Sequence, residues 1–150
     1  MRYLFFLAAV FGILLSCSHK EDNPEGLATK FSSEKFPQKW ELVSIQGNIA
    51  NMPPQTGSKM EWQEFYLLNL DGTLSKTRKR DGVTKTITGK YSFKSIGIEN
   101  FLEITYDNDS DIIGNCYGTP TEELFIKSEI EFKSTWQACD GPGLVYNRVE

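Results

Sequence analysis

The fold is decided by residues 71–93, which read DGTLSKTRKRDGVTKTITGKYSF. Two Asp-Gly pairs, Asp71-Gly72 and Asp81-Gly82, are flanked by strand-like runs, and such pairs are strong signals for β-hairpins. After the second pair, apolar residues of one parity alternate with threonine, serine and lysine of the other. The apolar positions are Val83, Ile87, Tyr91 and Phe93, interrupted by Lys85 and Gly89. This alternation predicts a strand with one buried face and one face in water.

The chain on both sides of this stretch repeats the pattern of short strands and turns. Strands are predicted over residues 40–45, 62–70, 73–80, 83–93, 101–106, 122–127, 129–135 and 144–149. The segment 51–59 contains Pro53-Pro54 and Gly57 and is expected to be a loop. With no convincing amphipathic helix, about eight strands joined by hairpins predict an all-β antiparallel barrel or sandwich. Gly89 is expected to mark the kind of bend that closes a small barrel.

The N-terminus has the features of a secretory signal that is cut from the mature chain. Arg2 precedes thirteen mostly apolar residues, 3–15, and the small Ser16 precedes Cys17. That apolar run spans only ~20 Å as a helix, well short of the ~30 Å hydrocarbon core of a bilayer, which argues against a transmembrane anchor. The stretch Leu14-Leu15-Ser16-Cys17 resembles the bacterial lipobox. We therefore expect a signal peptide over 1–16 and lipidation of Cys17.

Residues 17–39 are expected to be the lipidated cysteine followed by a flexible tether, and 40–150 to be one folded domain. Ser18 stands where Asp would signal retention in the inner membrane. Lys20-Glu21-Asp22 resembles the export tag of surface lipoproteins, although a solvated spacer would look the same. The expected location is the outer membrane, anchored by lipid and displayed on the cell surface, with the membrane as the first partner.

Charge and residue content exclude several function classes. Removal of Arg2 with the signal leaves 15 basic and 20 acidic side chains, a net charge near −5. That balance disfavours nucleic acid as a partner. The only histidine, His19, lies in the expected tether, so no histidine-dependent catalysis is expected, and neither an enzyme nor a cofactor is indicated.

Two groups of residues could be mistaken for a binding motif. The run 107–111 reads DNDSD and resembles the start of a calcium loop, but Ile112 and Gly118 stand where that motif requires Gly and Glu, so no metal is expected. Five basic residues surround the turn at 81–82 and predict a solvated hairpin rim, the alternative being a site for an anionic ligand at a barrel mouth. They are Lys76, Arg78, Lys79, Arg80 and Lys85.

Cys116 and Cys139 remain once Cys17 is assigned to the lipid. In an oxidising envelope compartment they are expected to form a disulfide, which would contribute ~3 kcal/mol on the chain-entropy model. The alternative, a metal-binding pair, lacks other soft ligands in the domain.

Trp40 near the first strand and Tyr146-Asn147-Arg148 in the last resemble the lipocalin-like lipoproteins, which are small eight-stranded barrels of Gram-negative envelopes. The turn 71–73 and the step 89–91 are similar to that family as well. The resemblance implies an up-and-down barrel in which Arg148 stacks on Trp40 at the closed end. Gln38 stands where lipocalins have glycine. The family also implies binding of a small molecule, without naming one.

Two functions follow as alternatives. The first is binding of a small apolar or amphipathic molecule in a barrel cup, and the second is a non-enzymatic scaffold or accessory subunit that uses a filled barrel to hold an envelope protein partner. An open apolar cavity would favour the first and a filled interior the second. Strand parity predicts the inward, ligand-binding candidates as Tyr66, Leu68, Tyr91, Phe93, Leu102, Ile104, Leu124, Ile126 and Phe132.

Overall fold

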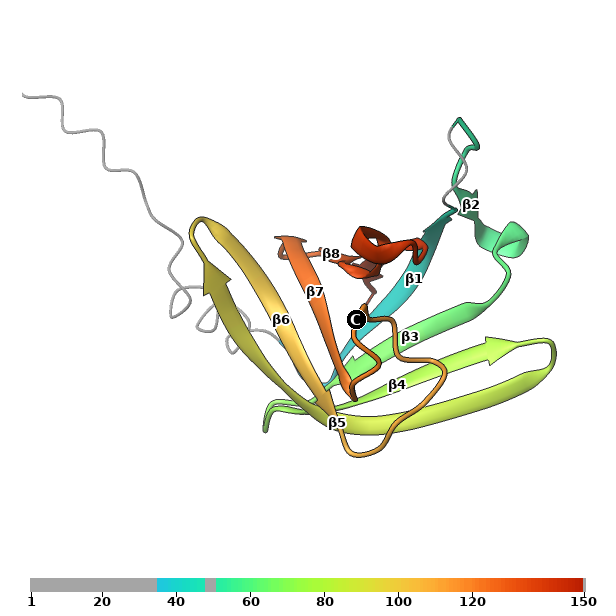
Figure 1. Cartoon of the computed structure of the whole chain (residues 1–150). Helices are drawn as coiled ribbons and strands as arrows, with labels where there is room; N and C mark the ends of the chain where they lie inside the picture. Colours follow the sequence, from blue (N-terminus) through green and yellow to red (C-terminus); the bar gives the residue numbers. More distant parts are fainter. Residues whose placement is uncertain (1–34, 48–50, 150) are drawn as a thin grey trace, which may run out of the picture.

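Figure 1 shows the protein as a computed structural model, which describes residues 35–47 and 51–149. Its strands are β1 (Gln38–Gln46), β2 (Gln55–Thr56), β3 (Gln63–Leu68), β4 (Thr73–Arg80), β5 (Val83–Ile96), β6 (Glu99–Tyr106), β7 (Thr121–Ser128), β8 (Glu131–Ser134) and β9 (Gly143–Arg148). Two short 3₁₀ helices, η1 (Gly57–Lys59) and η2 (Trp136–Cys139), lie in connections. Cys17, the expected signal peptide and most of the expected tether lie outside the described residues. Within those residues, no helix has the length and apolar character needed to cross a membrane.

The strands form one antiparallel sheet that closes on itself. The order runs β1-β3-β4-β5-β6-β7-β8-β9, and β9 pairs back onto β1. The short β2 pairs only with the end of β1, so the closed barrel has eight strands. Consecutive strands are neighbours throughout the barrel, which confirms the predicted up-and-down topology.

Both Asp-Gly pairs form the predicted hairpin turns. Gly72 between β3 and β4 has a positive φ of 81°, and Asp81 and Gly82 between β4 and β5 have φ of 50° and 78°. Two successive positive φ values suit a tight hairpin turn, which explains why Asp-Gly stands there. The Asp71 carboxylate accepts hydrogen bonds from Thr73 N and Thr73 Oγ1, and these lower the Asp71 pKa.

Gly89 lies within β5, opposite Tyr106 of β6, and β5 as a whole curves under the barrel (Figure 1). A Cβ at this position would lie 2.3 Å from the carbonyl oxygen of Thr105 on β6, closer than side chains are found. Only a residue without a side chain lets β6 approach so closely, which explains the glycine, while a bend at this residue stays a prediction.

The barrel has two chemically different ends. The "N-terminal end" consists of the start of β1, the turns 69–72, 97–98 and 129–130, and the end of β9. The "loop end" consists of the end of β1, the turn 81–82 and the two loops 107–120 and 135–142. The short turns leave the first end compact, whereas the long loops fold over the second.

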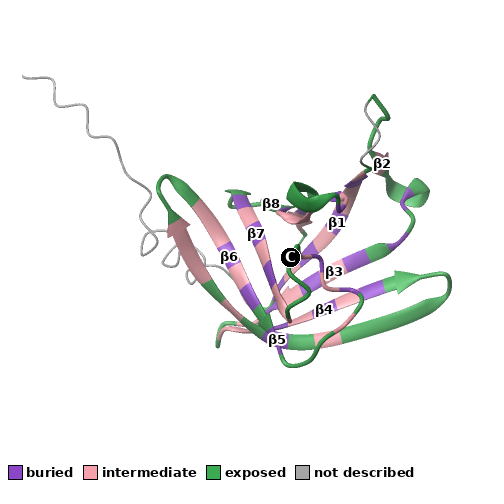
Figure 2. Ribbon diagram, in the orientation of Figure 1, coloured by how far each residue is buried: buried purple, intermediate pink, exposed green. Residues whose placement is uncertain are grey.

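The strand parity predicted for the core is correct at most positions (Figure 2). Of the nine inward candidates, seven are buried, and Tyr91 and Phe93 are half-buried and pack against the core cluster. Two further expectations were wrong. Val83, expected on the buried face of β5, is exposed because the β4–β5 hairpin extends past the barrel. The strand predicted over 129–135 is shorter, since β8 covers only Glu131–Ser134, and Ile130 is exposed in the turn before it.

Candidate functional site at the loop end of the barrel

Four charged side chains are buried inside the barrel, and we call them the buried charged cluster: Glu64, Lys76, Arg78 and Glu122. They come from β3, β4 and β7 and point inward, each on the same parity as its strand's buried apolar residues. The expectation that all five basic residues form a solvated rim was therefore wrong for Lys76 and Arg78. Only Lys79, Arg80 and Lys85 of that set are exposed.

Lys76 lies at the centre of the cluster. Its Nζ is 2.8 Å and 3.0 Å from the two carboxylate oxygens of Glu122 and 3.2 Å from Oε1 of Glu64. Arg78 donates from Nε to Oε2 of Glu64. Two anions and two cations balance inside the barrel, which is the condition under which buried charges are tolerated.

Three tyrosines complete the hydrogen bonding of the carboxylates. Tyr66 and Tyr106 donate to Oε2 of Glu122, and Tyr146 donates to Oε1 of Glu64. Burial, and then the charges of the two glutamates, raise the pKa of all three phenols well above the ordinary value of 10. The tyrosines therefore remain protonated donors, and the carboxylates are saturated by partners rather than free to act as bases.

Arg78 connects the cluster to the loop end. Its Nη2 donates to the carbonyl oxygen of Ile112 in the 107–120 loop at 3.2 Å, while its Nε holds Glu64. Burial lowers the Arg78 pKa, but the charge and hydrogen bond of Glu64 outweigh that effect and raise it. The same loop is held by Gly114 N, which donates to Oε1 of Glu122, and by an ion pair of 2.6 Å between Lys85 and Asp111.

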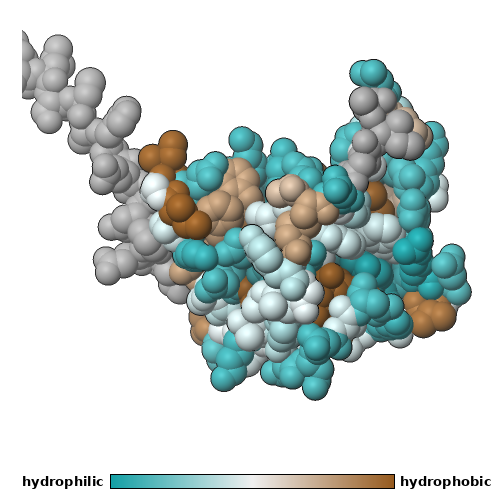
Figure 3. Space-filling view, in the orientation of Figure 1, coloured by the Kyte–Doolittle hydropathy of each residue, from teal (hydrophilic) through white to brown (hydrophobic). Residues whose placement is uncertain are grey.

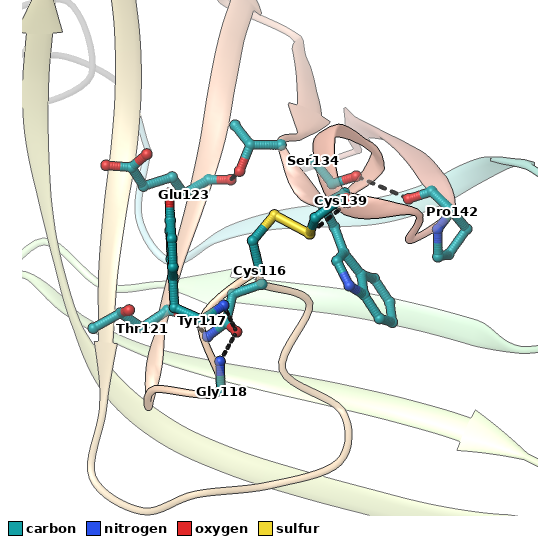
Figure 4. The surroundings of a disulfide bond; sticks show 11 residues. Cys116, Tyr117, Gly118, Thr121, Glu123, Ser134, Cys139 and Pro142 are labelled. Atoms are coloured by element: carbon teal, nitrogen blue, oxygen red, sulfur yellow. Dashed lines mark hydrogen bonds between the residues drawn. A yellow bond between two sulfur atoms is a disulfide. The ribbon is translucent and has the colours of Figure 1, made fainter. Parts of the chain in front are cut away.

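The predicted disulfide between Cys116 and Cys139 is confirmed, with the two Cα atoms 5.6 Å apart (Figure 4). It joins the 107–120 loop to η2 at the start of the 135–142 loop, so the two loops over the barrel are one covalent unit. Asn115 supports this junction, because its Oδ1 accepts from Tyr117 N and Gly118 N while its Nδ2 donates to the carbonyl oxygens of Thr119 and Thr121.

Trp136, next to the disulfide, is held between two glycines. A Cβ on Gly141 would lie 2.4 Å from the Trp136 ring, and one on Gly114 would lie 2.8 Å from it. The ring therefore packs directly on backbone from both loops. This contact fixes an aromatic wall at the loop end.

A pocket of about 390 Å³ lies beside this wall. Its lining includes Trp62, Trp136, Arg78, Arg80 and Glu61. Both guanidinium groups lie over the Trp62 ring, with Arg78 Cζ 4.7 Å and Arg80 Cζ 5.4 Å from its centroid. We call this space the mouth pocket.

Trp62 is only 6% exposed, yet the hydrogen bonding of its indole N–H is incomplete. Its Nε1 is buried and has no hydrogen-bond partner among the described residues. A buried N–H without a partner costs roughly 1–3 kcal/mol, so it requires an explanation such as a ligand or a water at the site.

A second pocket of about 270 Å³ opens on the other side of Arg78, Arg80 and Asp111. Its lining adds Val83 and Lys85 from the β4–β5 hairpin. Arg80 also contacts Glu61 at 3.2 Å. The loop end thus presents guanidinium groups, carboxylates and aromatic rings together, and Arg78 and Arg80 belong to both spaces.

The predicted ligand-binding residues lie together inside the barrel, but none of the nine lines any of the four pockets described for residues 35–47 and 51–149. Their side chains pack against one another in the core cluster instead. In those same residues, no group of three His, Cys, Asp or Glu side chains is arranged to hold a metal.

Trp40 and Arg148, the predicted barrel-closing pair, are directly opposite each other in the β1–β9 register. The Trp40 ring stacks on Phe132, with ring centroids 3.6 Å apart, and its Nε1 donates to Oε1 of the buried Gln38 at 3.2 Å. Gln38, which departs from the lipocalin pattern, therefore supplies a core acceptor. Stacking of Arg148 on Trp40 stays a prediction.

The mouth pocket was not predicted, because no motif in the sequence singles out Trp62 or Trp136. The cluster was not predicted either, although the parity of β3, β4 and β7 held the signal. No protein-family model, curated protein or solved structure matches the chain.

Proposed function

We propose that the protein is a lipid-anchored envelope protein that binds a small amphipathic molecule carrying an acidic group, and that it binds without performing chemistry. The mouth pocket is the proposed site. This proposal keeps the small-molecule binding expected from the lipocalin-like resemblance, but moves it from the core to the loop end.

The observation that carries the proposal is the mouth pocket itself, in which two guanidinium groups lie over the Trp62 ring, while the buried Nε1 of that ring has no partner among the described residues. A carboxylate or sulfonate would suit the arginines, which bind such oxyanions through paired hydrogen bonds. The rings of Trp62 and Trp136 provide area for an apolar body. A volume of about 390 Å³ lies within the range of small-molecule sites.

Arg78 supports this assignment because it is positioned in advance. Glu64 and the Ile112 carbonyl use its Nε and Nη2, and these two bonds leave Nη1 uncommitted. A guanidinium held by the fold loses little freedom on binding, which favours affinity.

The experiment is a titration with anilinonaphthalene sulfonate, a fluorescent probe that combines flat rings with one acidic group. We expect saturable binding of one probe per chain. Arg80→Gln should weaken it about tenfold, whereas Lys79→Gln, the exposed neighbour on β4, should leave it unchanged. Equal affinities for these two variants would contradict the proposal.

Trp62→Phe provides a sharper version of the test, since it keeps a ring and removes only the indole N–H and part of the area. In a ligand site this change should weaken probe binding severalfold. It should not lower the free energy of unfolding by more than about 1 kcal/mol, because it also removes an unsatisfied buried donor.

The second candidate is the scaffold, and the filled interior of the barrel favours it. The buried charged cluster occupies the space behind the mouth pocket, and the nine apolar candidates pack against one another. Absence of saturable probe binding to the native chain would select this candidate.

A further inference from the structure

The N-terminal end of the barrel carries an exposed aliphatic side chain on every one of its turns. Ile98 in the β5–β6 turn is 99% exposed, and Ile96 at the end of β5 is 54% exposed. Figure 3 shows this hairpin tip as a hydrophobic patch. The other exposed aliphatic residues at this end are Leu70, Ile130 and Val149.

This concentration exceeds what single surface residues produce. Eight large hydrophobic side chains are exposed in the described part of the chain, and five of them lie at this end, although its turns are only two to four residues long. The other three lie apart at the loop end, Met52 and Tyr117 in its longer connections and Val83 at the start of β5. Scattered exposed hydrophobics need no explanation, but a set collected on one end indicates a contact surface.

The β5–β6 tip is built to project these residues. Gly97, between the two isoleucines, has a positive φ of 62°, so the turn is tight, and β5 is the longest strand at 14 residues. Turns in water favour Gly, Asn, Asp and Ser, whereas this one combines Gly97 with Ile98 and follows directly on Ile96. The tip therefore presents two aliphatic side chains at the far point of a stiff hairpin.

The start of β1 indicates what binds to this surface. β1 starts at Gln38, at the same end of the barrel as the exposed residues. Cys17, the proposed site of acylation, precedes Gln38 by only 21 positions in the chain. An anchor attached at this end brings this end, rather than the loop end, toward the membrane.

We propose that the N-terminal end docks on the lipid bilayer, with Ile96 and Ile98 inserted at the boundary between headgroups and acyl chains. The orientation rests on the proposed lipid anchor. Each apolar turn also carries a carboxylate beside its aliphatic residue, namely Asp71, Glu99 and Glu129. Docking therefore uses apolar insertion and does not depend on anionic headgroups. The mouth pocket then faces away from the membrane.

The test uses the full chain expressed in a Gram-negative host, extracted from its membrane and reconstituted with phosphatidylcholine vesicles whose acyl chains are brominated, since bromine quenches tryptophan fluorescence within the bilayer. Two variants are compared, Ile98→Trp at the proposed docking end and Val83→Trp at the β4–β5 tip. Val83 is a matched control, because it is 58% exposed and also lies at a hairpin tip.

We expect brominated lipid to lower the added fluorescence of Ile98→Trp at least twofold and to leave that of Val83→Trp unchanged. Lipid without bromine should quench neither, and anionic lipid should not increase the effect. Vesicle flotation of the unaltered chain separates the two proposals. If the unaltered chain floats but Ile98→Trp is not quenched, the lipid anchor stands and the docking surface is wrong. If the unaltered chain does not float, both the anchor and the docking surface are wrong. Equal quenching of both variants, or a dimer that Ile98→Ser converts to monomer, would also overturn the docking surface.

Discussion

Replacing Lys76 by methionine should strongly destabilise the barrel, because it removes the cation that two buried carboxylates share. The Nζ atom lies 2.8 Å and 3.0 Å from the oxygens of Glu122 and 3.2 Å from Glu64, with all three side chains fully buried. Methionine keeps most of the volume, so the loss is electrostatic rather than a cavity. Removing one partner of a buried ion pair costs about 3–5 kcal/mol, and we expect that loss for Lys76→Met.

The assay is urea unfolding followed by circular dichroism, with the disulfide kept intact. The midpoint should fall without a large change in the slope against urea, which reports the surface exposed on unfolding. Lys79→Met is the control, since Lys79 lies on the same strand but is exposed, and its effect should stay within about 0.5 kcal/mol.

If Lys76→Met does not fold, a double variant tests the same electrostatic prediction. Adding Glu122→Gln removes the carboxylate that Lys76 contacts twice and leaves Glu64 paired with Arg78, so the double variant should be more stable than the single one. A loss below about 1 kcal/mol for Lys76→Met, or no recovery in the double variant, would refute the view that this cluster is held by charge balance.

Three further outcomes are expected. Replacing Cys116 and Cys139 together by serine should lower the free energy of unfolding by about 3 kcal/mol, because the bridge closes a loop with a sequence separation of 23, and circular dichroism should show the barrel retained. Stability against urea should decline as the pH rises above about 10, because the pKa values of Tyr66, Tyr106 and Tyr146 are raised in the folded barrel while the unfolded phenols ionise near 10. A flat profile between pH 9 and pH 11 would contradict that assignment. Arg148→Ala should lower stability by about 0.5–2 kcal/mol if the guanidinium stacks on Trp40, with probe affinity at the loop end unchanged.

Strand positions could be predicted from the sequence because antiparallel strands record burial with a period of two. Leu102, Ile104, Leu124 and Ile126 alternate with polar residues, and all four are buried as expected. The Asp-Gly turns could be predicted as well, since Asp and Gly favour tight turns, and Gly72 and both residues of Asp81-Gly82 adopt a positive φ.

The buried charged cluster was not predicted, because Lys76 and Arg78 were assigned to a solvated rim on their charge and not on their parity in the strand. Lys76 and Arg78 share their parity with the buried Leu74, and Glu122 shares its parity with Leu124 and Ile126. Two bases and two acids on the inward parity of three strands of one barrel could have indicated a neutral internal network. Ile130 is exposed for a different reason, since it lies in the turn before β8 and not on the strand.

The mouth pocket could not be predicted at all, because its walls come from segments far apart in the chain. Trp62 precedes β3, Arg80 ends β4, and Trp136 lies in η2. Only the closure of the barrel and the loop-to-loop disulfide bring them together.

Arg78 explains why a barrel with a filled interior can still support a binding site. A guanidinium placed at a pocket must be held in position, and a buried one must be neutralised; Glu64 does both for Arg78 from inside the barrel. Tyr146 donates to Glu64, and Lys76 joins that carboxylate to Glu122, whose Oε1 also accepts from Gly114 N in the 107–120 loop. The charges that fill the interior thus orient the pocket's arginine and hold the loop beside it, so that filling of the core and preorganisation of the mouth are one structural feature.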